Sequence, residues 1–250
     1  QYRFPAADSE PGLAGHAFGN LLIAAMADIT GDFEEGVRQS NHVLAVRGQV
    51  VPVAPSALNL NAELADGSIL AGQSRIMRSR GIRRVWLSPA SVEASPEAVE
   101  AIRAADLIVL GPGSLYTSLL PSLLVPGIRS ALEQTQALRV YVVNVATQLG
   151  ETEGYTLSEH VAALAAHDVG HLFDLVLAND DTSARVPKGY PAEPVRIDMP
   201  IAGDRPRLEL AGVVDPENAH RHDPARLTAV LMRLLEERPA RRPVAPARTA

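Results

Sequence analysis

The residues best suited to bind a ligand form one run, Gly111-Pro112-Gly113-Ser114-Leu115-Tyr116-Thr117-Ser118. It follows directly on four apolar residues, 107–110, that predict a buried strand of a parallel sheet, and it leads into a predicted helix. Glycine lets the backbone approach a ligand closely, and the N–H groups at the start of a helix favour an anion. The serine and threonine hydroxyls could donate to the same anion. We therefore predict that this loop holds a phosphate group of a nucleotide.

This loop matches neither of two familiar phosphate-binding motifs. A G-x-G-x-x-G motif would need a third glycine at position 116, which is Tyr, and a Walker loop would need a lysine. Lys188 is the only lysine of the chain. A tight turn between a strand and a helix, with Ser114 as the cap, would account for the same residues without any ligand.

Polar residues also follow two other predicted strands. The run Asn144-Val145-Ala146-Thr147-Gln148-Leu149-Gly150-Glu151-Thr152 comes after apolar residues 140–143, and Asn179-Asp180-Asp181-Thr182 comes after residues 175–178. Ligands of open parallel sheets bind beyond the carboxyl ends of the strands, so we expect both runs at the same edge as the Gly-Pro-Gly loop. Asn179 could recognise a base or a sugar. The alternative is that both runs are solvated turns.

Two predicted helix starts offer further groups for an anion. The segment Gly15-His16-Ala17-Phe18-Gly19-Asn20 opens the first helix, and His220-Arg221-His222-Asp223 precedes the last one, where Arg221 could clamp a pyrophosphate. Ordinary helix caps would explain both segments as well. The histidines form no zinc pattern, and no pair of carboxylates has a spacing that demands acid–base chemistry. We therefore predict no metal site and assign no catalytic residue.

Composition narrows the classes of function. The 250 residues carry a net charge of -6 with a pI near 5.7, which argues against binding to nucleic acid or to an anionic membrane. The absence of cysteine excludes disulfides, thiolate nucleophiles and Cys-ligated metals. The sequence has no apolar run of about 18 residues that would predict a transmembrane helix, and no visible signal peptide. We expect a cytoplasmic protein without a membrane span.

The first elements predicted by the sequence are two helices. Residues 21–26 are apolar nearly all round, which predicts a buried helix capped by Asn20. A second helix is predicted from about Asp32 to Gln39, with Thr30 or Asp32 as its cap.

The stretch over residues 43–70 has a different character. Its short apolar runs are separated by Gly, Pro and Asp-Gly, and residues 57–64 alternate with a period close to two. Antiparallel strands and hairpins fit this pattern best. They could pair within one chain or across the interface of a homo-oligomer.

From residue 82 onward the pattern is β-α-β. A strand over 85–87 and a helix over 96–104, capped by Ser95, precede the three apolar strands already named. Further helices are predicted over 158–167 and 224–237. This alternation predicts the α/β class, with a mainly parallel sheet, helices on both faces and a small antiparallel strand region. We expect a single domain over residues 1–238 and a disordered tail over 239–250.

Three of these runs together resemble one known family. The 12–25 segment Gly12-Leu13-Ala14-Gly15-His16-Ala17-Phe18-Gly19-Asn20-Leu21-Leu22-Ile23-Ala24-Ala25, the 111–118 loop and the 144–152 run are similar, in order and spacing, to the YvcK or gluconeogenesis-factor family. That family belongs to the CofD-like superfamily, which includes 2-phospho-L-lactate transferase. The resemblance extends from residue 1 to about 238. Smaller departures are Ala146 in place of Met, Leu149 in place of Pro and Gln73 in place of Glu.

The larger departure from the family lies at the beginning. The family's Gly-Gly-Gly-Thr-Gly turn and its Asp-Asp-Gly-Gly-Ser-Ser stretch are absent from this sequence. The chain therefore resembles a fragment without the first strand and a first phosphate-binding loop. We expect this to weaken autonomous binding.

The resemblance implies a Rossmann-like α/β fold, a cytoplasmic location and a role in cell-shape and wall homeostasis during growth on gluconeogenic carbon. It implies binding of a UDP-activated amino sugar such as UDP-N-acetylglucosamine, with no established reaction. Mg²⁺ could accompany the diphosphate, although no dedicated ligand set is visible. The positions that match by motif or by segment are the 111–118 loop, His16, Asn20, Asn144, Thr147, Gln148, Asn179, Tyr190 and Arg221.

Three functions follow as hypotheses. The first is a regulatory protein that binds a nucleotide sugar. The second is a CofD-type transferase that moves a phospholactyl group from a nucleotide diphosphate to a deazaflavin precursor. The third is an α/β scaffold whose polar loops are only turns and which acts through protein partners.

Overall fold

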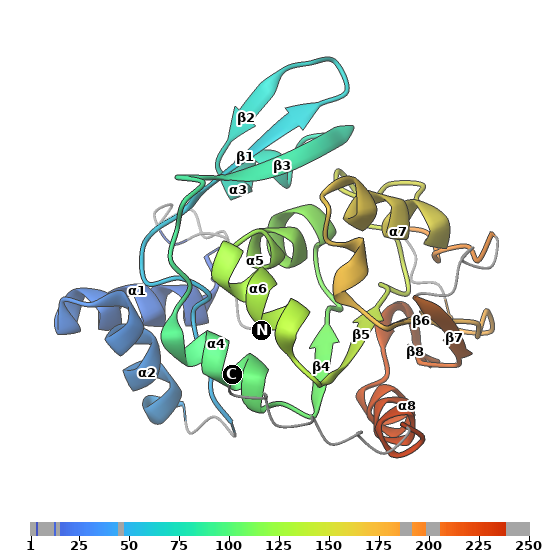
Figure 1. Ribbon diagram of the computed structural model, residues 1–250. Helices are drawn as coiled ribbons and strands as arrows, with labels where there is room; N and C mark the ends of the chain where they lie inside the picture. Colours follow the sequence, from blue (N-terminus) through green and yellow to red (C-terminus); the bar gives the residue numbers. More distant parts are fainter. Residues whose placement is uncertain are drawn as a thin grey trace, which may run out of the picture.

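The computed structural model describes residue 4, residue 13 and residues 16–44, 48–185, 192–198 and 206–238 (Figure 1). The predicted tail over 239–250 lies outside these ranges. The order of the elements is α1 (Phe18–Thr30), α2 (Phe33–Val43), β1 (Asn59–Leu64), β2 (Ile69–Ala71), α3 (Gln73–Ile76), β3 (Ile82–Ser88), α4 (Pro96–Ala104), β4 (Leu107–Leu110), η1 (Leu115–Leu119), α5 (Leu120–Leu123), α6 (Pro126–Gln134), β5 (Leu138–Val142), α7 (Leu157–Ala166), η2 (Gly170–Leu172), β6 (Leu175–Asn179), β7 (Arg207–Ala211), β8 (Val214–Asp215), β9 (Asn218–His222) and α8 (Pro224–Glu236).

The main sheet has four parallel strands in the order β4-β5-β6-β7. Its register places Tyr141 of β5 beside Leu110 of β4 and Val176 of β6. The prediction of an α/β protein with a mainly parallel sheet is therefore confirmed. One detail of it is wrong, because β4 was expected to be a buried strand. It is an edge strand of the described sheet, and Val109 is 38% exposed there.

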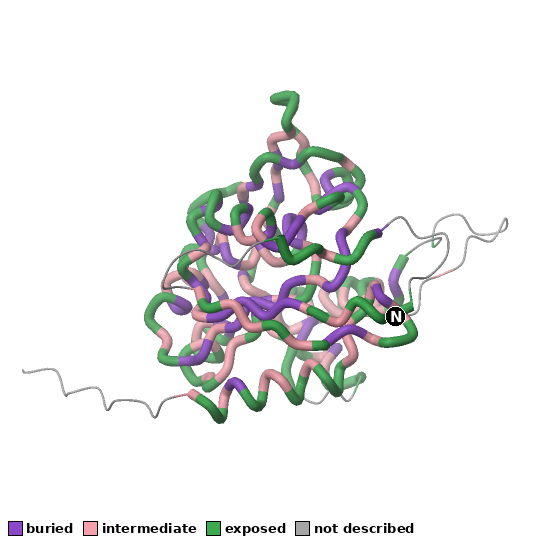
Figure 2. Tube along the Cα trace, turned by 90° about the vertical axis from the view of Figure 1, so that its right-hand side faces the viewer, coloured by how far each residue is buried: buried purple, intermediate pink, exposed green. Residues whose placement is uncertain are grey.

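Helices cover both faces of this sheet, as the sequence predicted. Tyr141 and Val176 belong to a large core that α5, α6 and α7 help to close on one face. Val140 and Leu177 face the other way, and α8 covers them through its Leu234 side chain. Figure 1 shows α8 on the opposite side of the sheet from α5 and α6, and Figure 2 shows the buried residues gathered along the strands between them.

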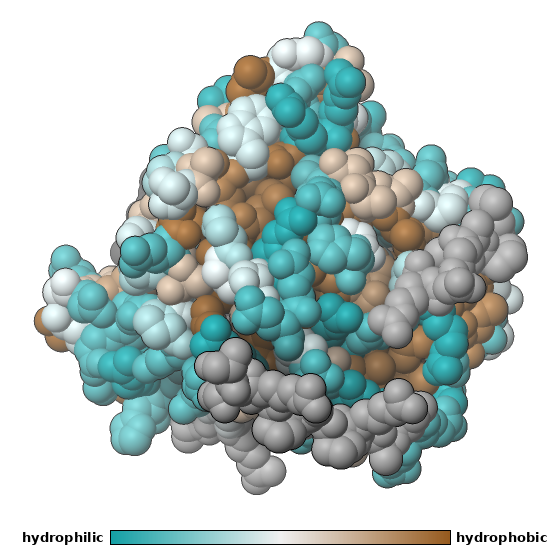
Figure 3. All heavy atoms as spheres, viewed as in Figure 1, coloured by the Kyte–Doolittle hydropathy of each residue, from teal (hydrophilic) through white to brown (hydrophobic). Residues whose placement is uncertain are grey.

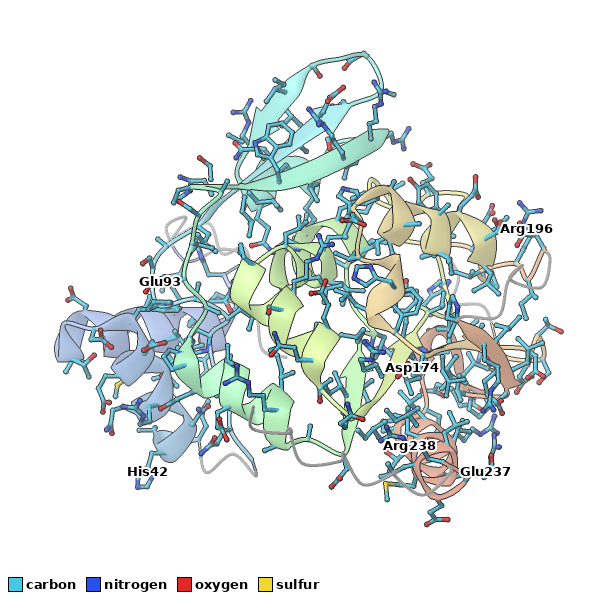
Figure 4. All side chains as sticks on the ribbon, in the orientation of Figure 1. His42, Glu93, Asp174, Arg196, Glu237 and Arg238 are labelled. Atoms are coloured by element: carbon cyan, nitrogen blue, oxygen red, sulfur yellow. The ribbon has the colours of Figure 1, made fainter. Side chains whose placement is uncertain are left out.

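An ion pair joins two strands at the amino-terminal edge of the sheet. The guanidinium of Arg139 donates to both carboxylate oxygens of Asp174, at 2.8 and 3.1 Å, and the Arg139 N–H donates to the same carboxylate. Asp174, labelled in Figure 4, directly precedes β6, and Arg139 belongs to β5. This bidentate pair fixes the stagger of β5 against β6 at the edge opposite the strands' carboxyl ends.

The antiparallel region is a separate three-stranded sheet in the order β2-β1-β3, which projects from the rest of the chain in Figure 1. The prediction that the strand at 85–87 begins the β-α-β pattern is therefore wrong, since β3 pairs with β1. The reason lies in its burial: Val85 and Leu87 are buried while the residues between and before them are more exposed, as in a sheet with one wet face. Within 43–70, described residues 48–58 form no strand.

The free edge of β3 is covered by a histidine. The N–H of Val85 donates to Nε2 of His167 at 2.9 Å, and Nδ1 of the same ring lies 2.7 Å from the carbonyl of Ala163. Because Nε2 accepts, Nδ1 must carry the proton and donate to that carbonyl. The neutral imidazole therefore connects the antiparallel sheet to the end of α7.

The helix α1 differs from its prediction in two ways. It starts at Phe18 after Ala17 without a side-chain cap, so Asn20 lies inside the helix. None of its residues is buried, because α1 packs on α2 and little else among the described residues. The crossing is close, since a Cβ on Gly36 would meet the Ala27 backbone at 2.5 Å.

Three predicted caps have different outcomes. Asp32 accepts the N–H of Glu35 at 2.8 Å and caps α2, as predicted. Asp223 caps α8 in the same way. Ser95 precedes α4 but makes no capping hydrogen bond, and its buried hydroxyl has no partner among the described residues. No helix in the described ranges is long and apolar enough to cross a membrane.

Candidate functional site

The loop after β4 requires glycine at its first position. Gly111 has a φ of +88°, and a Cβ there would lie 2.9 Å from the carbonyl oxygen of Val142 in the neighbouring strand. The Gly111–Pro112 peptide bond is cis. The chain then enters η1, a π-helical turn that continues into α5. Gly111 therefore allows the loop to pass directly over the end of β5.

Gly113 is held by the next strand end. The Asn144 side chain accepts from the N–H of Gly113 and donates to its carbonyl, both at 3.0 Å. This reciprocal pair fixes the loop to the carboxyl end of β5. A Cβ on Gly113 would meet nothing within 4 Å, and Gly113 has no positive φ. This glycine therefore borders open space rather than filling a tight turn.

A buried acid connects the two polar loops. Glu151 is 3% exposed, and its carboxylate accepts from the N–H of Tyr116 at 3.0 Å and from the hydroxyl of Thr117 at 2.5 Å. Gln148 lies between Glu151 and Ser114: its Nε2 is 3.4 Å from the carboxylate, and its Oε1 accepts from the Ser114 hydroxyl at 2.9 Å. Glu151 belongs to the polar run predicted over 144–152, but this contact was not predicted.

Two polar residues of the predicted loop face the interior. Tyr116 is 2% exposed, and its hydroxyl lies 2.9 Å from that of Tyr155. Burial is the main reason that the pKa of Tyr116 is raised above its usual value. Thr117 is also buried, against Glu151. The structure therefore directs Tyr116 and Thr117 away from the surface on which Gly113 and Ser114 lie.

A cavity of about 520 Å³ lies beyond the carboxyl ends of β4 and β5. One side, which we call the loop wall, consists of Gly113, Ser114, Asn144, Thr147 and Gln148. The other side, which we call the hairpin wall, consists of Asn218, His220, Arg221 and His222 from β9. Val145, Ala146 and Ala192 complete the lining. The structure thus brings together six of the predicted ligand residues, namely Gly113, Ser114, Asn144, Thr147, Gln148 and Arg221.

The segment at 192–196 is hydrogen-bonded to both walls of this cavity. The N–H of Thr147 donates to the carbonyl of Glu193 at 2.7 Å, and the N–H of Val195 donates to the carbonyl of Val145 at 3.0 Å. The hydroxyl of Thr147 accepts from the N–H of Glu193. Nε2 of His220 lies 3.1 Å from the carbonyl of Ala192, which connects this segment to the hairpin wall.

The charge of the cavity is suited to an anion. Arg221 is exposed at its rim, and no carboxylate belongs to the described lining. Burial lowers the pKa of His222, and the buried Nε2 of this ring has no hydrogen-bond partner among the described residues. In the described part of the chain, no group of three or more His, Asp or Glu side chains is placed to hold a metal ion. Figure 3 shows an apolar surface where the antiparallel sheet meets the helices.

The remaining predicted residues lie elsewhere. Asn179 accepts from the N–H groups of Val213 and Val214, both at 3.1 Å, and donates to the carbonyl of Asp181. It therefore organises the chain after β7 and is not part of the described cavity lining. His16 and Asn20 are exposed near the start of α1. Further predicted positions outside the lining are Gly111, Pro112 and Ser118, and Tyr190 lies outside the described residues.

Sequence reasoning missed most of the hairpin wall. Asn218, His220 and His222 come from a short polar strand, and Ala192 comes from an irregular segment. The available signal was the pair of histidines on either side of Arg221, because alternate residues of a strand point to the same face. Because no strand was predicted at 218–222, the alternation could not be used to place the two histidines on one face.

A sequence model of the family described as 2-phospho-L-lactate transferase CofD matches residues 1–213 of this chain. The gluconeogenesis factor of Halalkalibacterium halodurans is 40% identical over 242 residues, which cover 93% of this chain and 73% of that protein. The gluconeogenesis factor of Bacillus subtilis is 40% identical over 247 residues, which cover 95% of this chain and 76% of that protein.

A relative from Nostoc sp. is 47% identical over 242 residues, which cover 93% of this chain and 52% of the relative. The chain therefore spans about half of the Nostoc relative and about three quarters of the other two. A crystal structure of a UPF0052 family member from Bacillus halodurans matches with a TM-score of 0.77 and 38% identity, covering 93% of this chain and 75% of that chain. The described fold thus has a solved counterpart.

Proposed function

The chain belongs to the CofD family, and on that premise we propose that its cavity binds the diphosphate of a nucleotide sugar such as UDP-N-acetylglucosamine. One observation carries the proposal. The cavity lies beyond the carboxyl ends of β4 and β5, contains an exposed arginine, and has no carboxylate in its described lining. A diphosphate needs such a cationic surface, and ligands of open parallel sheets bind at this edge.

The two walls suit two parts of such a ligand. Arg221 carries the planar guanidinium that pairs with phosphate oxygens, and it belongs to the same strand as the lining residues His220 and His222. The loop wall offers amide and hydroxyl groups, which recognise sugar or base edges. A volume of about 520 Å³ lies in the range of small-molecule sites. The proposal needs no metal ligand from the described lining.

We further propose that ligand binding regulates cell-shape and wall homeostasis during growth on gluconeogenic carbon, in the cytoplasm. The relatives called gluconeogenesis factor support the link to gluconeogenic growth. Under it the protein acts as a sensor, and no residue is assigned a catalytic role.

The test is calorimetric titration of UDP-N-acetylglucosamine into this chain, with uridine and N-acetylglucosamine as separate controls. We expect saturable binding of the nucleotide sugar and weaker binding of either part. Arg221→Ala should weaken that binding, while Arg226→Ala, a matched change on α8 outside the described lining, should not. An intact, folded chain that binds no uridine nucleotide would overturn the proposal.

The second candidate is transfer of a phospholactyl group from a nucleotide diphosphate, which the description of the matching family favours. The described lining offers His220 and His222 for proton transfer and no carboxylate. The purified chain would be incubated with guanosine-diphosphate-activated lactate and a deazaflavin acceptor. Release of the guanosine nucleotide that depends on the acceptor would establish this function, and its absence alongside uridine binding would exclude it.

A further inference from the structure

We propose that Glu151 is a positioning residue, which occupies the anion position at the start of η1 and turns Ser114 into a hydrogen-bond acceptor toward the cavity. The first half of this inference concerns the chain alone. The second half rests on the proposed function, because it states what part of a nucleotide sugar Ser114 would contact. The ligand group would be a hydroxyl or an N–H, and not a phosphate oxygen.

The first step is that the helix start already holds an anion. The Tyr116 N–H and the Thr117 hydroxyl are donors at this end of η1, and both donate to Glu151. No described Arg, Lys or His side chain forms an ion pair with Glu151 within 4.0 Å. The buried carboxylate therefore depends on hydrogen-bond donors and the dipole of the helix start, which is how such a terminus holds a bound anion.

The second step is that Glu151 fixes the orientation of the Gln148 amide. A carboxylate only accepts hydrogen bonds, so the Gln148 group facing it must be the NH₂ donor. In agreement, Gln148 Nε2 lies 3.4 Å from Oε1 of Glu151. The carbonyl oxygen of that amide then faces Ser114. The neighbouring carboxylate thus decides between the two orientations of the amide.

The third step follows at Ser114. Its single hydroxyl proton is donated to Gln148 Oε1 at 2.9 Å, so the oxygen's lone pairs are what it offers to the cavity. Phosphate oxygens only accept and would find no donor there. A sugar hydroxyl or an N-acetyl N–H would instead donate to the Ser114 oxygen. Glu151 thus acts on the ligand through Gln148 and Ser114, and the phosphates belong nearer to Arg221.

The ligand-independent test uses Glu151→Ala and formate, a small carboxylate. Thermal unfolding would be followed with increasing sodium formate, against sodium chloride at equal ionic strength. We expect formate to raise the Tm of Glu151→Ala above the chloride control and to leave wild type unaffected. The matched control is Glu153→Ala, since Glu153 is an exposed acid of the same loop that pairs with Arg80. If formate raises the Tm of Glu151→Ala no more than chloride does, the helix start is not an anion position.

The ligand-dependent test is a double-mutant cycle between positions 151 and 114, whose side chains are joined through Gln148. Calorimetry with UDP-N-acetylglucosamine would measure Glu151→Gln, Ser114→Ala and the double variant. We expect each single change to weaken binding about tenfold, and the double variant to be about as weak as either one. Glu153→Gln should bind as wild type does. Full additivity, near a hundredfold for the double variant, would overturn the relay through Gln148.

The two ways of failing are distinguishable. If wild type binds no uridine nucleotide, the proposed function fails, and the formate experiment still decides whether Glu151 fills an anion position. If wild type binds and Glu151→Gln binds equally well, the proposed function stands and the positioning role is wrong. Should Glu151→Ala not fold, the nearly isosteric Glu151→Gln carries the affinity measurement.

Discussion

The two walls of the cavity are built on opposite principles. On the loop wall, the polar groups are already bonded to one another: Asn144 to Gly113, Ser114 to Gln148, and Gln148 to Glu151. On the hairpin wall, Arg221 is exposed and the buried Nε2 of His222 has no described partner. The shape of the cavity and its charge are therefore supplied by different walls. The loop wall is preorganised and neutral, and the hairpin wall provides the positive charge that an anionic ligand would neutralise.

The largest expected effect comes from filling the cavity from the loop wall. In Gly113→Leu the new side chain enters open space, so we expect an unfolding midpoint close to that of wild type. Affinity for UDP-N-acetylglucosamine should fall at least about 100-fold, because the side chain occupies ligand volume. Calorimetry and thermal unfolding on the same sample check both. Loss of fold together with binding would instead support the scaffold hypothesis.

The next effect separates two glycines of one loop. Gly111→Ala places a Cβ 2.9 Å from the Val142 carbonyl oxygen at a φ of +88°. We expect the free energy of unfolding to fall by about 2 kcal/mol, since both the conformation and the contact are unfavourable. Urea denaturation measures it, with Gly113→Ala as the matched control, which should change stability little. Equal stability of the two variants would show that the loop wall is not rigid.

A smaller effect is expected on the hairpin wall. Removing the Arg221 guanidinium should lower nucleotide-sugar affinity about tenfold, which is the scale of a charge-assisted hydrogen bond. Arg221→Lys should retain part of the affinity, because the positive charge stays while the bidentate donor geometry of the guanidinium is lost. Calorimetry at low and high salt provides the check. If Arg221→Ala keeps both the affinity of wild type and its salt dependence, the charge of this wall plays no part in binding.

The smallest effect concerns pH and the interior behind the loop wall. Burial lowers the pKa of His160 and of His167 below the value of about 6.5 for a free histidine. The unfolded chain therefore binds these protons first as the pH falls, so their contribution to stability is complete above about pH 6.5 and is lost as the pH drops through the folded pKa values. We expect a lower Tm at pH 5.5 than at pH 7.5.

A variant sharpens this prediction. In His167→Gln the amide oxygen could still accept from the Val85 N–H, but the group no longer titrates. The Tm of this variant should depend less on pH than that of wild type, while His42→Gln, a change of an exposed histidine labelled in Figure 4, should keep the wild-type dependence. Identical pH profiles for wild type and His167→Gln would contradict the assignment.

Two strands of the parallel sheet could be predicted because their residues are apolar and are followed by turn formers. Residues 107–110 and 175–178 are of this kind, and both are strands of the parallel sheet. The strand at 207–211 escaped prediction because Arg207 and Glu209 make it resemble a solvated segment. The pairing partner of β3 could not be predicted either, since a strand's own residues do not indicate whether its neighbour is parallel or antiparallel.

The candidate site was predictable in part for a related reason. Gly113 and Asn144 follow strands, and the carboxyl ends of parallel strands meet at one edge of the sheet, so such positions lie close together. Glu151 could not be predicted, because an acid in a polar run is expected to face water. Its burial depends on Tyr116 and Thr117, which lie 35 and 34 positions earlier in the chain. Contacts over such separations are set by packing and not by local pattern.

The imidazole of His167 on the edge of β3 has one more consequence. An uncovered strand edge is a template on which other chains can add, and this ring occupies the Val85 N–H that would begin such an addition. Acid that protonates the ring removes the acceptor and leaves that N–H free. The same residue that holds the antiparallel sheet in place would then determine the pH at which the protein starts to assemble into aggregates.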